Sequence, residues 1–195
     1  MAQVAVVYHS GYGHTKALAE AVAGGARSVP GTEVALIPVE EVEAKAAVLD
    51  GADALVFGAP TYMGSASAPF KAFMEWSASR WQGQKWKDKL AAGFTNSASQ
   101  SGDKLSTLVQ LAVFAAQHGL IWAGLDLLPG NNNSKGSIDD LNRLGSFIGA
   151  MAQSNADQGL EGMRESDLRT AERLGARVAS LAKRLGGSAV AAAAA

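Results

Sequence analysis

The feature that most constrains the fold is a short apolar run, Val4-Ala5-Val6-Val7-Tyr8, which Ser10-Gly11-Tyr12-Gly13-His14-Thr15 follows almost at once. A nearly all-apolar run bounded by a turn signal is typical of a strand buried on both faces of a parallel sheet. The second stretch carries two glycines and a hydroxyl at each end, and a helical pattern begins at its last residue. A strand, a glycine-bearing loop and a helix start in this order predict an α/β fold.

The same alternation of apolar runs and amphipathic stretches continues along the chain. Apolar runs predict further strands at 34–37, 54–59, 90–94 and 120–123. Amphipathic stretches predict helices at 16–28, 39–49, 69–79 and 105–116, and a last helix capped by Ser166. Strands that alternate with helices predict a parallel sheet covered on both faces, with right-handed crossovers. We therefore expect a doubly wound, five-stranded sheet of order 2-1-3-4-5 in three α/β/α layers, with its ligand site at the carboxyl ends of the strands.

The 195 residues fit one domain, which we place at 1–187. The alanine-rich segment 188–195 is predicted to be a disordered tail. Residues 129–165 are rich in Gly, Asn and Ser and are predicted to form a long loop with limited helix.

Charge and composition exclude several classes of function. Seventeen basic and eighteen acidic side chains leave a net charge near −1, so no nucleic-acid partner is expected. The absence of cysteine excludes disulfides and thiolate metal ligands, and the histidines lack the spacing of a metal site. No apolar run approaches the ~18 residues of a membrane span, and no cationic leader precedes the first strand. A cytoplasmic protein without a membrane span is expected.

The loop Ser10–Thr15 has the elements of an anion site. Backbone N–H groups at the mouth of a helix are unpaired, the helix dipole favours negative charge, and glycine lets a ligand approach the backbone. The loop contains no Lys or Arg, so hydroxyls and amides would hold the anion. This suits one terminal phosphate and matches neither the Walker loop nor the dinucleotide fingerprint. An ordinary strand–helix turn with two glycines is the alternative.

Two other loops are expected at the same edge of the sheet, because the carboxyl ends of parallel strands lie together. The loop after the third strand offers apolar surface for an aromatic ring through Pro60, Thr61, Tyr62, Met63 and Gly64. The loop after the fourth strand offers hydrogen-bonding groups for a polar ring edge through Thr95, Asn96, Ser97, Ala98, Ser99 and Gln100. One phosphate, a linker and a heteroaromatic ring describe flavin mononucleotide (FMN).

The chain resembles the flavodoxin-like NAD(P)H:quinone oxidoreductases of the tryptophan-repressor-binding-protein (WrbA) type. The resemblance rests on the Ser10–Thr15 loop, on Pro60-Thr61-Tyr62-Met63-Gly64, on Trp81 and on His118-Gly119. It implies a flavodoxin-like fold, bound FMN, NADH or NADPH as electron donor, a quinone as acceptor, and a homo-oligomer (dimer or tetramer). His118 is implied to contact the carbonyl edge of the flavin as a catalytic residue and to stabilise negative charge there. Tyr12 and Trp81 are implied to frame the substrate slot, and alternate occupancy of that slot predicts ping-pong kinetics.

Three departures from the family pattern limit what the resemblance implies. The third loop has no glycine before Gly102, and the usual insertion between the second and third strands is absent. Residues 130–164 also differ from the corresponding stretch of the family. The last two regions help to assemble the family's tetramer and to close its pocket, so the oligomeric state and the substrate range carry over least.

Purely structural roles are the alternatives for several of these residues. His118, at the end of a helix, could simply interact favourably with the helix dipole. Trp76 and Trp86 are predicted to belong to a surface cluster or a subunit contact. For the whole chain, a one-electron carrier of flavodoxin type and a non-catalytic interaction protein are the alternatives. Carriers of that type are expected to be strongly acidic, which this chain is not.

Overall fold

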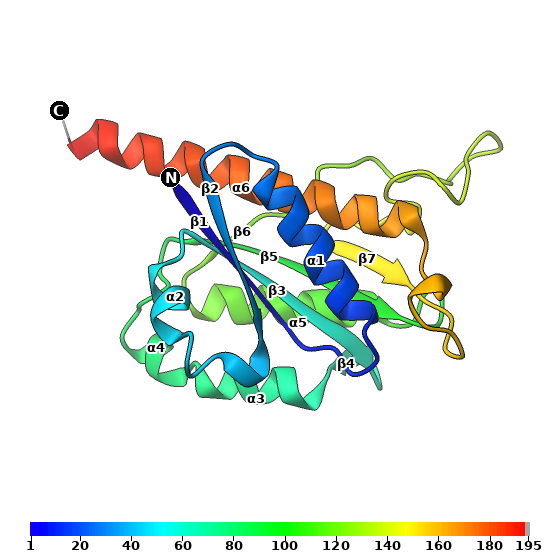
Figure 1. The fold of residues 1–195 in the computed structure, drawn as a ribbon, viewed down its shortest axis with the longest axis horizontal. Helices are drawn as coiled ribbons and strands as arrows, with labels where there is room; N and C mark the ends of the chain where they lie inside the picture. Colours follow the sequence, from blue (N-terminus) through cyan, green and yellow to red (C-terminus); the bar gives the residue numbers. More distant parts are fainter. Residues whose placement is uncertain (194–195) are drawn as a thin grey trace.

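The computed structural model describes residues 1–193 of the chain, and side chains as far as residue 186. Among the described residues, five parallel strands form the main path of the sheet, in the order β2-β1-β3-β5-β6, and two short strands described below add to it (Figure 1). Their bounds are β1 Ala2–Tyr8, β2 Thr32–Pro38, β3 Ala54–Tyr62, β5 Leu90–Ser97 and β6 Ile121–Trp122. In chain order these are strands one to five, so the predicted order 2-1-3-4-5 is confirmed.

Helices cover both faces of the sheet, which gives the predicted three layers (Figure 1). Helices α1 (His14–Arg27) and α6 (Glu165–Ala193) pack on one face. Helices α2 (Ala46–Gly51), α3 (Ala68–Trp76) and α5 (Lys104–Gln117) pack on the other, and α4 (Ala78–Gln82) continues α3. The α1–α6 contact is very close, because a Cβ on Gly25 or on Gly175 would overlap the backbone of the opposite helix.

Two predicted helices are shorter than their apolar patterns. The helix predicted at 39–49 is split into a 3-10 turn, η1 (Val39–Glu41), and the short α2. The helix predicted at 69–79 ends at Trp76, where the Ser77 hydroxyl donates to the Met74 carbonyl at 2.7 Å. Such a side-chain bond to the preceding turn competes with the regular backbone ladder.

Strands β3 and β5 extend three residues beyond their predicted ends. Their register pairs Ala59 with Thr95 and Pro60 with Asn96, so the first residues of both predicted loops belong to the sheet. A two-residue strand, β4 (Ser65–Ala66), then turns back on the end of β3. The sheet therefore holds the bases of these loops rigidly at its carboxyl edge.

The fifth strand is split, which the sequence did not predict. Strand β6 pairs only with Leu90 and Ala91, whereas β7 (Ala150–Gln153) pairs with the far half of β5, from Phe94 to Ser97. Residues 123–149 leave the sheet between them and return beside Gly93. The Trp122 indole, which donates to the Ile148 carbonyl at 2.8 Å, lies over this glycine.

The prediction of a loop over 129–165 is corrected accordingly. The segment contributes β7 and a 3-10 turn, η2 (Leu160–Gly162), and delivers residues 154–158 to the carboxyl edge of the sheet. Ser166 lies inside α6 rather than at its cap, and its hydroxyl donates to the Ile138 carbonyl at 2.9 Å.

The end of the chain leaves one prediction open. Helix α6 runs to Ala193, and residues 194–195 lie outside the described part, so the disordered tail at 188–195 stays a prediction. No helix of the described residues is both long and apolar enough to cross a membrane.

Candidate functional site

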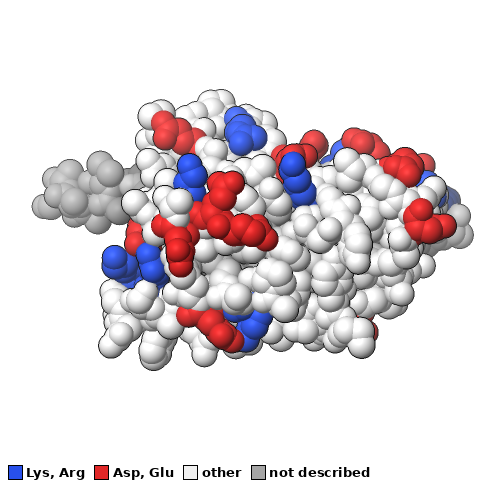
Figure 2. Space-filling model, turned by 60° about the horizontal axis from the view of Figure 1, so that its bottom comes forward, with Lys and Arg blue, Asp and Glu red and all other residues white. Residues whose placement is uncertain are grey.

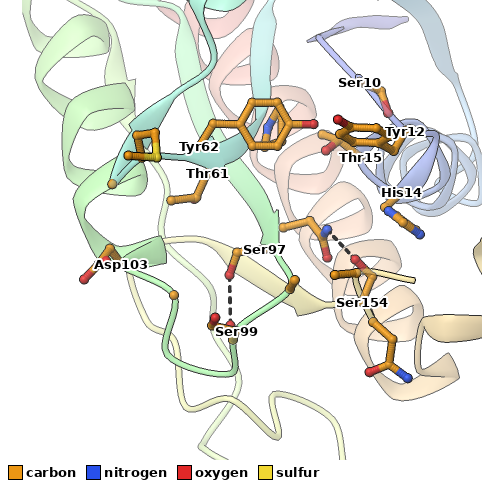
Figure 3. Close-up of a pocket in the computed structure, with 18 of the residues that line it drawn as sticks. Ser10, Tyr12, His14, Thr15, Thr61, Tyr62, Ser97, Ser99, Asp103 and Ser154 are labelled. Carbon is orange, nitrogen blue, oxygen red and sulfur yellow. Dashed lines mark hydrogen bonds between the residues drawn. The ribbon is translucent and has the colours of Figure 1, made fainter. Parts of the chain in front are cut away.

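A cavity of about 640 Å³ opens at the carboxyl edge of the sheet, where the starts of α1 and α5 face the ends of β3 and β5 (Figure 3). The structure brings all three predicted loops to it. The predicted residues that line it are Ser10, Tyr12, His14, Thr15, Pro60, Thr61, Tyr62, Met63, Gly64, Asn96, Ser97, Ala98 and Ser99.

The first loop leaves backbone donors free at the mouth of α1. Gly13 adopts φ +92°, a left-handed conformation that favours glycine, and no described side chain caps the helix. The first bond along the helix is Ala17 N–H to the Gly13 carbonyl, so the N–H groups of residues 14–16 have no helical partner. The Ser10 hydroxyl accepts the Gly13 N–H at 3.1 Å and keeps its own proton available to donate. Thr15, 2% exposed, adds a second hydroxyl to this mouth.

The second loop forms an aromatic wall beside the first. The rings of Tyr12 and Tyr62 meet edge to face with centroids 6.3 Å apart, and both side chains are exposed (Figure 3). A Cβ on Gly11 would lie 2.7 Å from the Tyr62 hydroxyl, so a larger residue there would push the exposed Tyr62 side chain aside. Met63 is fully exposed at the same rim. Exposed aromatic and thioether surface around a cavity suits a flat, largely apolar ligand.

The third loop supplies polar groups opposite that wall. The Asn96 amide nitrogen donates to the Ser154 hydroxyl at 2.8 Å, whereas its buried amide oxygen has no partner among the described residues. The Ser97 hydroxyl donates to the Ser99 carbonyl at 3.0 Å, which tightens the turn (Figure 3). A buried acceptor without a partner is costly, so Asn96 is ready to receive a donor from a ligand.

Of the cofactor-binding residues predicted in the three loops, four do not line the cavity. Gly11 and Gly13 shape the first loop through their backbone. Thr95 is fully buried, and its hydroxyl pairs with that of Thr61 at 2.7 Å. Gln100 lies on the outer side of the loop and lines a separate hollow.

Sequence reasoning missed six lining residues. They are Gly102, Asp103, Ser154, Asn155, Ala156 and Gln158. The last four follow β7, so only the split of the fifth strand brings them to this edge. His14 ties this segment to the first loop, since its Nε2 lies 3.1 Å from the Gln158 carbonyl and 3.0 Å from the Gly159 carbonyl and must donate to them.

Lys104 is a further residue that the sequence did not indicate. Lys104 is the first residue of α5 and is only 1% exposed. Its Nζ donates to the Ser97 hydroxyl at 2.7 Å and to the carbonyls of Ser99 and Gln100 at 2.8 Å each. Burial lowers the pKa of this amine to about 8. The third loop is therefore wrapped around a buried ammonium group.

The structure does not bring His118 or Trp81 to the cavity. Both line a second hollow, at the other end of α5 from Asp103. Fifteen residues of helix separate His118 from Asp103, which is about 22 Å at 1.5 Å per residue. His118 therefore cannot contact a flavin bound in the cavity of its own chain.

The surroundings of His118 also differ from those expected of a charged stabiliser. Its Nε2 lies 2.9 Å from the Ser77 hydroxyl, and its ring packs 4.5 Å from that of Trp86. Burial lowers the pKa of His118 to about 4, so the imidazole is neutral at pH 7. Trp86 is wholly buried and donates to the Asp50 carboxylate at 2.9 Å, so its predicted surface position is wrong. Trp76 packs on Phe73 and under the Arg80 guanidinium, whereas Trp81 is half exposed.

Charged side chains are scarce in the cavity, since Asp103 is the one Asp, Glu, Lys or Arg among its described lining residues. On the face shown in Figure 2, acidic and basic side chains are interspersed, and a broad area carries neither. Within residues 1–193, no group of three or more His, Cys, Asp or Glu side chains is arranged to hold a metal ion.

Comparisons with known proteins agree on one group. The profile of a family described as NADPH-dependent FMN reductase matches residues 31–125. Flavodoxin FldP of Pseudomonas aeruginosa is 41% identical over 189 residues, which cover 95% of this chain and 99% of that protein. An NAD(P)H dehydrogenase (quinone) of Archaeoglobus fulgidus is 33% identical over 208 residues, which cover 95% and 100%. A solved structure, the flavodoxin, WrbA-like protein from Agrobacterium tumefaciens, gives a TM-score of 0.74 at 41% identity, over 94% of this chain and 99% of that chain.

Proposed function

This chain belongs to the flavodoxin-like NAD(P)H:quinone oxidoreductase family of the WrbA type, and on that premise we propose that it is an FMN-dependent enzyme. In this proposal, NADH or NADPH reduces FMN held in the cavity, and a quinone then takes two electrons from it. The two substrates use the slot beside the ring in turn, which gives ping-pong kinetics.

One observation carries the proposal: uncharged donors at the mouth of α1 share a cavity with an aromatic wall and a polar loop. Free N–H groups and the hydroxyls of Ser10 and Thr15 suit a phosphate monoester, since bonds to a charged acceptor are the strong ones. Tyr12 and Tyr62 offer surface to a flat ring and exclude water from it. The unpartnered amide oxygen of Asn96 suits the single N–H donor of an oxidised isoalloxazine.

The roles of protein and cofactor are separate in such a site. The flavin supplies the two-electron chemistry, and the protein supplies binding, orientation and electrostatics. The first loop anchors the phosphate, the aromatic wall orients the ring, and the third loop contacts its polar edge. His14 keeps the segment 154–158 closed against the first loop through the carbonyls of Gln158 and Gly159.

For His118 and Trp81 the geometry requires a second copy of the chain. Neither residue lines the cavity, and His118 lies about 22 Å along α5 from Asp103, so in this proposal they act on a flavin that another subunit binds. We therefore propose a homo-oligomer, a dimer or a tetramer, in which this hollow faces a neighbouring cavity. Light scattering tests the assembly. In Trp81→Ala, retained FMN with altered quinone kinetics would support the role, whereas lost FMN would contradict it.

A one-electron carrier is the second candidate, because a relative with 41% identity is named a flavodoxin. Carriers dock on partners through long-range attraction, which requires a surface dominated by one charge. The net charge of −1 and the mixed face in Figure 2 favour the enzyme.

Two measurements on the purified protein test the proposal. Titration with FMN, followed by its visible absorbance, is expected to saturate at one FMN per chain. The complex is then expected to oxidise NADH or NADPH in the steady state when benzoquinone is present. Bound FMN without turnover would indicate the carrier, and no spectral change with FMN would contradict both candidates.

A further inference from the structure

Lys104 is a buried positive charge that the proposed reaction does not yet use. Its Nζ sits inside the turn formed by residues 97–100 and donates to three oxygens of that turn, at 2.7 to 2.8 Å. Ser97 and Ser99 also line the cavity. The amine thus lies directly behind the cavity wall, at the loop assigned to the polar edge of the flavin.

This charge is not neutralised by an ion pair. Within the described part of the chain, no carboxylate lies within 4.0 Å of Nζ. The nearest acidic influence is Asp167, which is itself engaged by Arg143 at 2.6 and 2.9 Å and by the Gln153 N–H at 3.0 Å. Asp167 is thus already paired with Arg143, and the Lys104 ammonium group remains without an ion-pair partner behind the loop.

We propose that Lys104 is a positioning residue with an electrostatic effect: it fixes the loop 97–100 against FMN and makes the bound flavin easier to reduce. The inference rests on the proposed function, because it requires FMN in the cavity. It goes beyond that function by assigning control of the flavin potential to a residue that does not contact the flavin.

The physical reason lies in where charge develops. Two-electron reduction places negative charge at the pyrimidine edge of the flavin, the edge that the third loop is expected to face. A fixed cation in a water-poor wall stabilises such a charge more strongly than solvent-exposed groups do, because the effective dielectric constant is lower there. Hydrogen bonds among neutral hydroxyl and carbonyl groups could also hold the loop in place, but they would not stabilise the reduced flavin over the oxidised flavin in this way.

The effect should depend on pH. Burial lowers the pKa of Lys104 to about 8; Asp167 opposes that shift and Arg143 adds to it. Asp103, which lines the cavity beside the lysine, is the other charged neighbour. Lys104 is thus mostly charged at pH 7 and loses its charge in alkaline solution.

The test compares Lys104→Met and Lys104→Gln with Lys45→Met, a change of an exposed lysine outside the cavity. Affinity for oxidised FMN is measured by fluorescence titration, and the two-electron potential by reduction with a reference dye. Lys104→Met is expected to lower the affinity ratio of reduced to oxidised FMN at least tenfold at pH 7, a fall of about 30 mV in potential. Lys104→Gln, which retains a donor for the loop, is expected to lower the potential similarly while binding oxidised FMN within threefold of the wild type.

Two further results are expected. Lys45→Met should match the wild type at every pH. The potential difference between wild type and Lys104→Gln should shrink at pH 9.5, where both side chains are neutral.

Other results would overturn the inference. A wild-type potential in both Lys104 variants, even with weaker binding of oxidised FMN, would mean that the lysine only supports the loop. If Lys104→Met does not fold, the comparison of Lys104→Gln with the wild type decides. Failure of the wild type to bind FMN would overturn the proposed function as well, whereas bound FMN with the expected shift but no quinone turnover would overturn the proposed enzyme alone.

Discussion

Replacing Thr15 by Val isolates one hydroxyl of the proposed phosphate site. The side chain is 2% exposed in the first turn of α1 and lines the cavity, and valine keeps its branched shape. The loss is therefore a hydrogen bond to a charged acceptor, worth about 1.5–3 kcal/mol. The dissociation constant for FMN should rise about 10- to 150-fold.

The assay for Thr15→Val is fluorescence titration of the purified apoprotein with FMN. Thr32→Val is the matched control, because the Thr32 hydroxyl is buried without a described partner and lies outside the cavity. It should leave the FMN affinity unchanged. An affinity of Thr15→Val within twofold of the wild type would refute the assignment of this helix mouth to the phosphate.

Three predictions concern the fold that positions the site. Gly25→Ala should lower the free energy of unfolding, measured in urea, by more than about 2 kcal/mol, because the new Cβ would overlap the backbone of α6. In the control Gly24→Ala, the new Cβ meets nothing within 4 Å, so this variant should be more stable than the wild type by about 0.5–1 kcal/mol. Equal effects of the two substitutions would contradict the close contact between the helices. Arg143→Met should cost about 3–5 kcal/mol by the same assay, since it leaves the buried Asp167 carboxylate without its bidentate partner, and a cost below 1 kcal/mol would contradict this. The pKa of Lys104 falls on folding from 10.5 to about 8, so between these pH values the unfolded chain keeps a proton that the folded chain has released. The free energy of unfolding of the wild type, relative to that of Lys104→Met, should therefore rise by about 2–3 kcal/mol from pH 8 to pH 10.5. A difference that does not change with pH would contradict the buried charge.

The sequence predicted the sheet well because each strand has a strong local signature. Val4–Tyr8 and the run at 54–59 are apolar throughout, as strands buried on both faces are, and the glycine-bearing loop after the first strand marks the sheet edge. The three site loops followed from topology alone, because parallel strands end together. Their exact membership did not follow, since Thr95 is fully buried and its hydroxyl pairs with that of Thr61 at 2.7 Å.

What the sequence did not reveal depends on tertiary contacts. Strand β7 is four residues long and forms where the chain returns beside Gly93, a packing event that leaves no periodic pattern. The lining residues 154–158 were missed for that reason. Lys104 was missed because lysine is almost always exposed, and only the oxygens of the turn at 97–100 make its burial possible. The role of His118 was implied by the family resemblance, which does not reveal that α5 separates His118 from the cavity of its own chain.

The central claim is that uncharged groups at the mouth of α1 hold the phosphate of FMN. The most direct test compares the affinities of the wild-type protein for FMN and for riboflavin, which has the same ring and no phosphate. Several hydrogen bonds to a dianion should make FMN bind at least about 100-fold more tightly. Equal affinities would contradict the claim, because the ring alone would then account for binding.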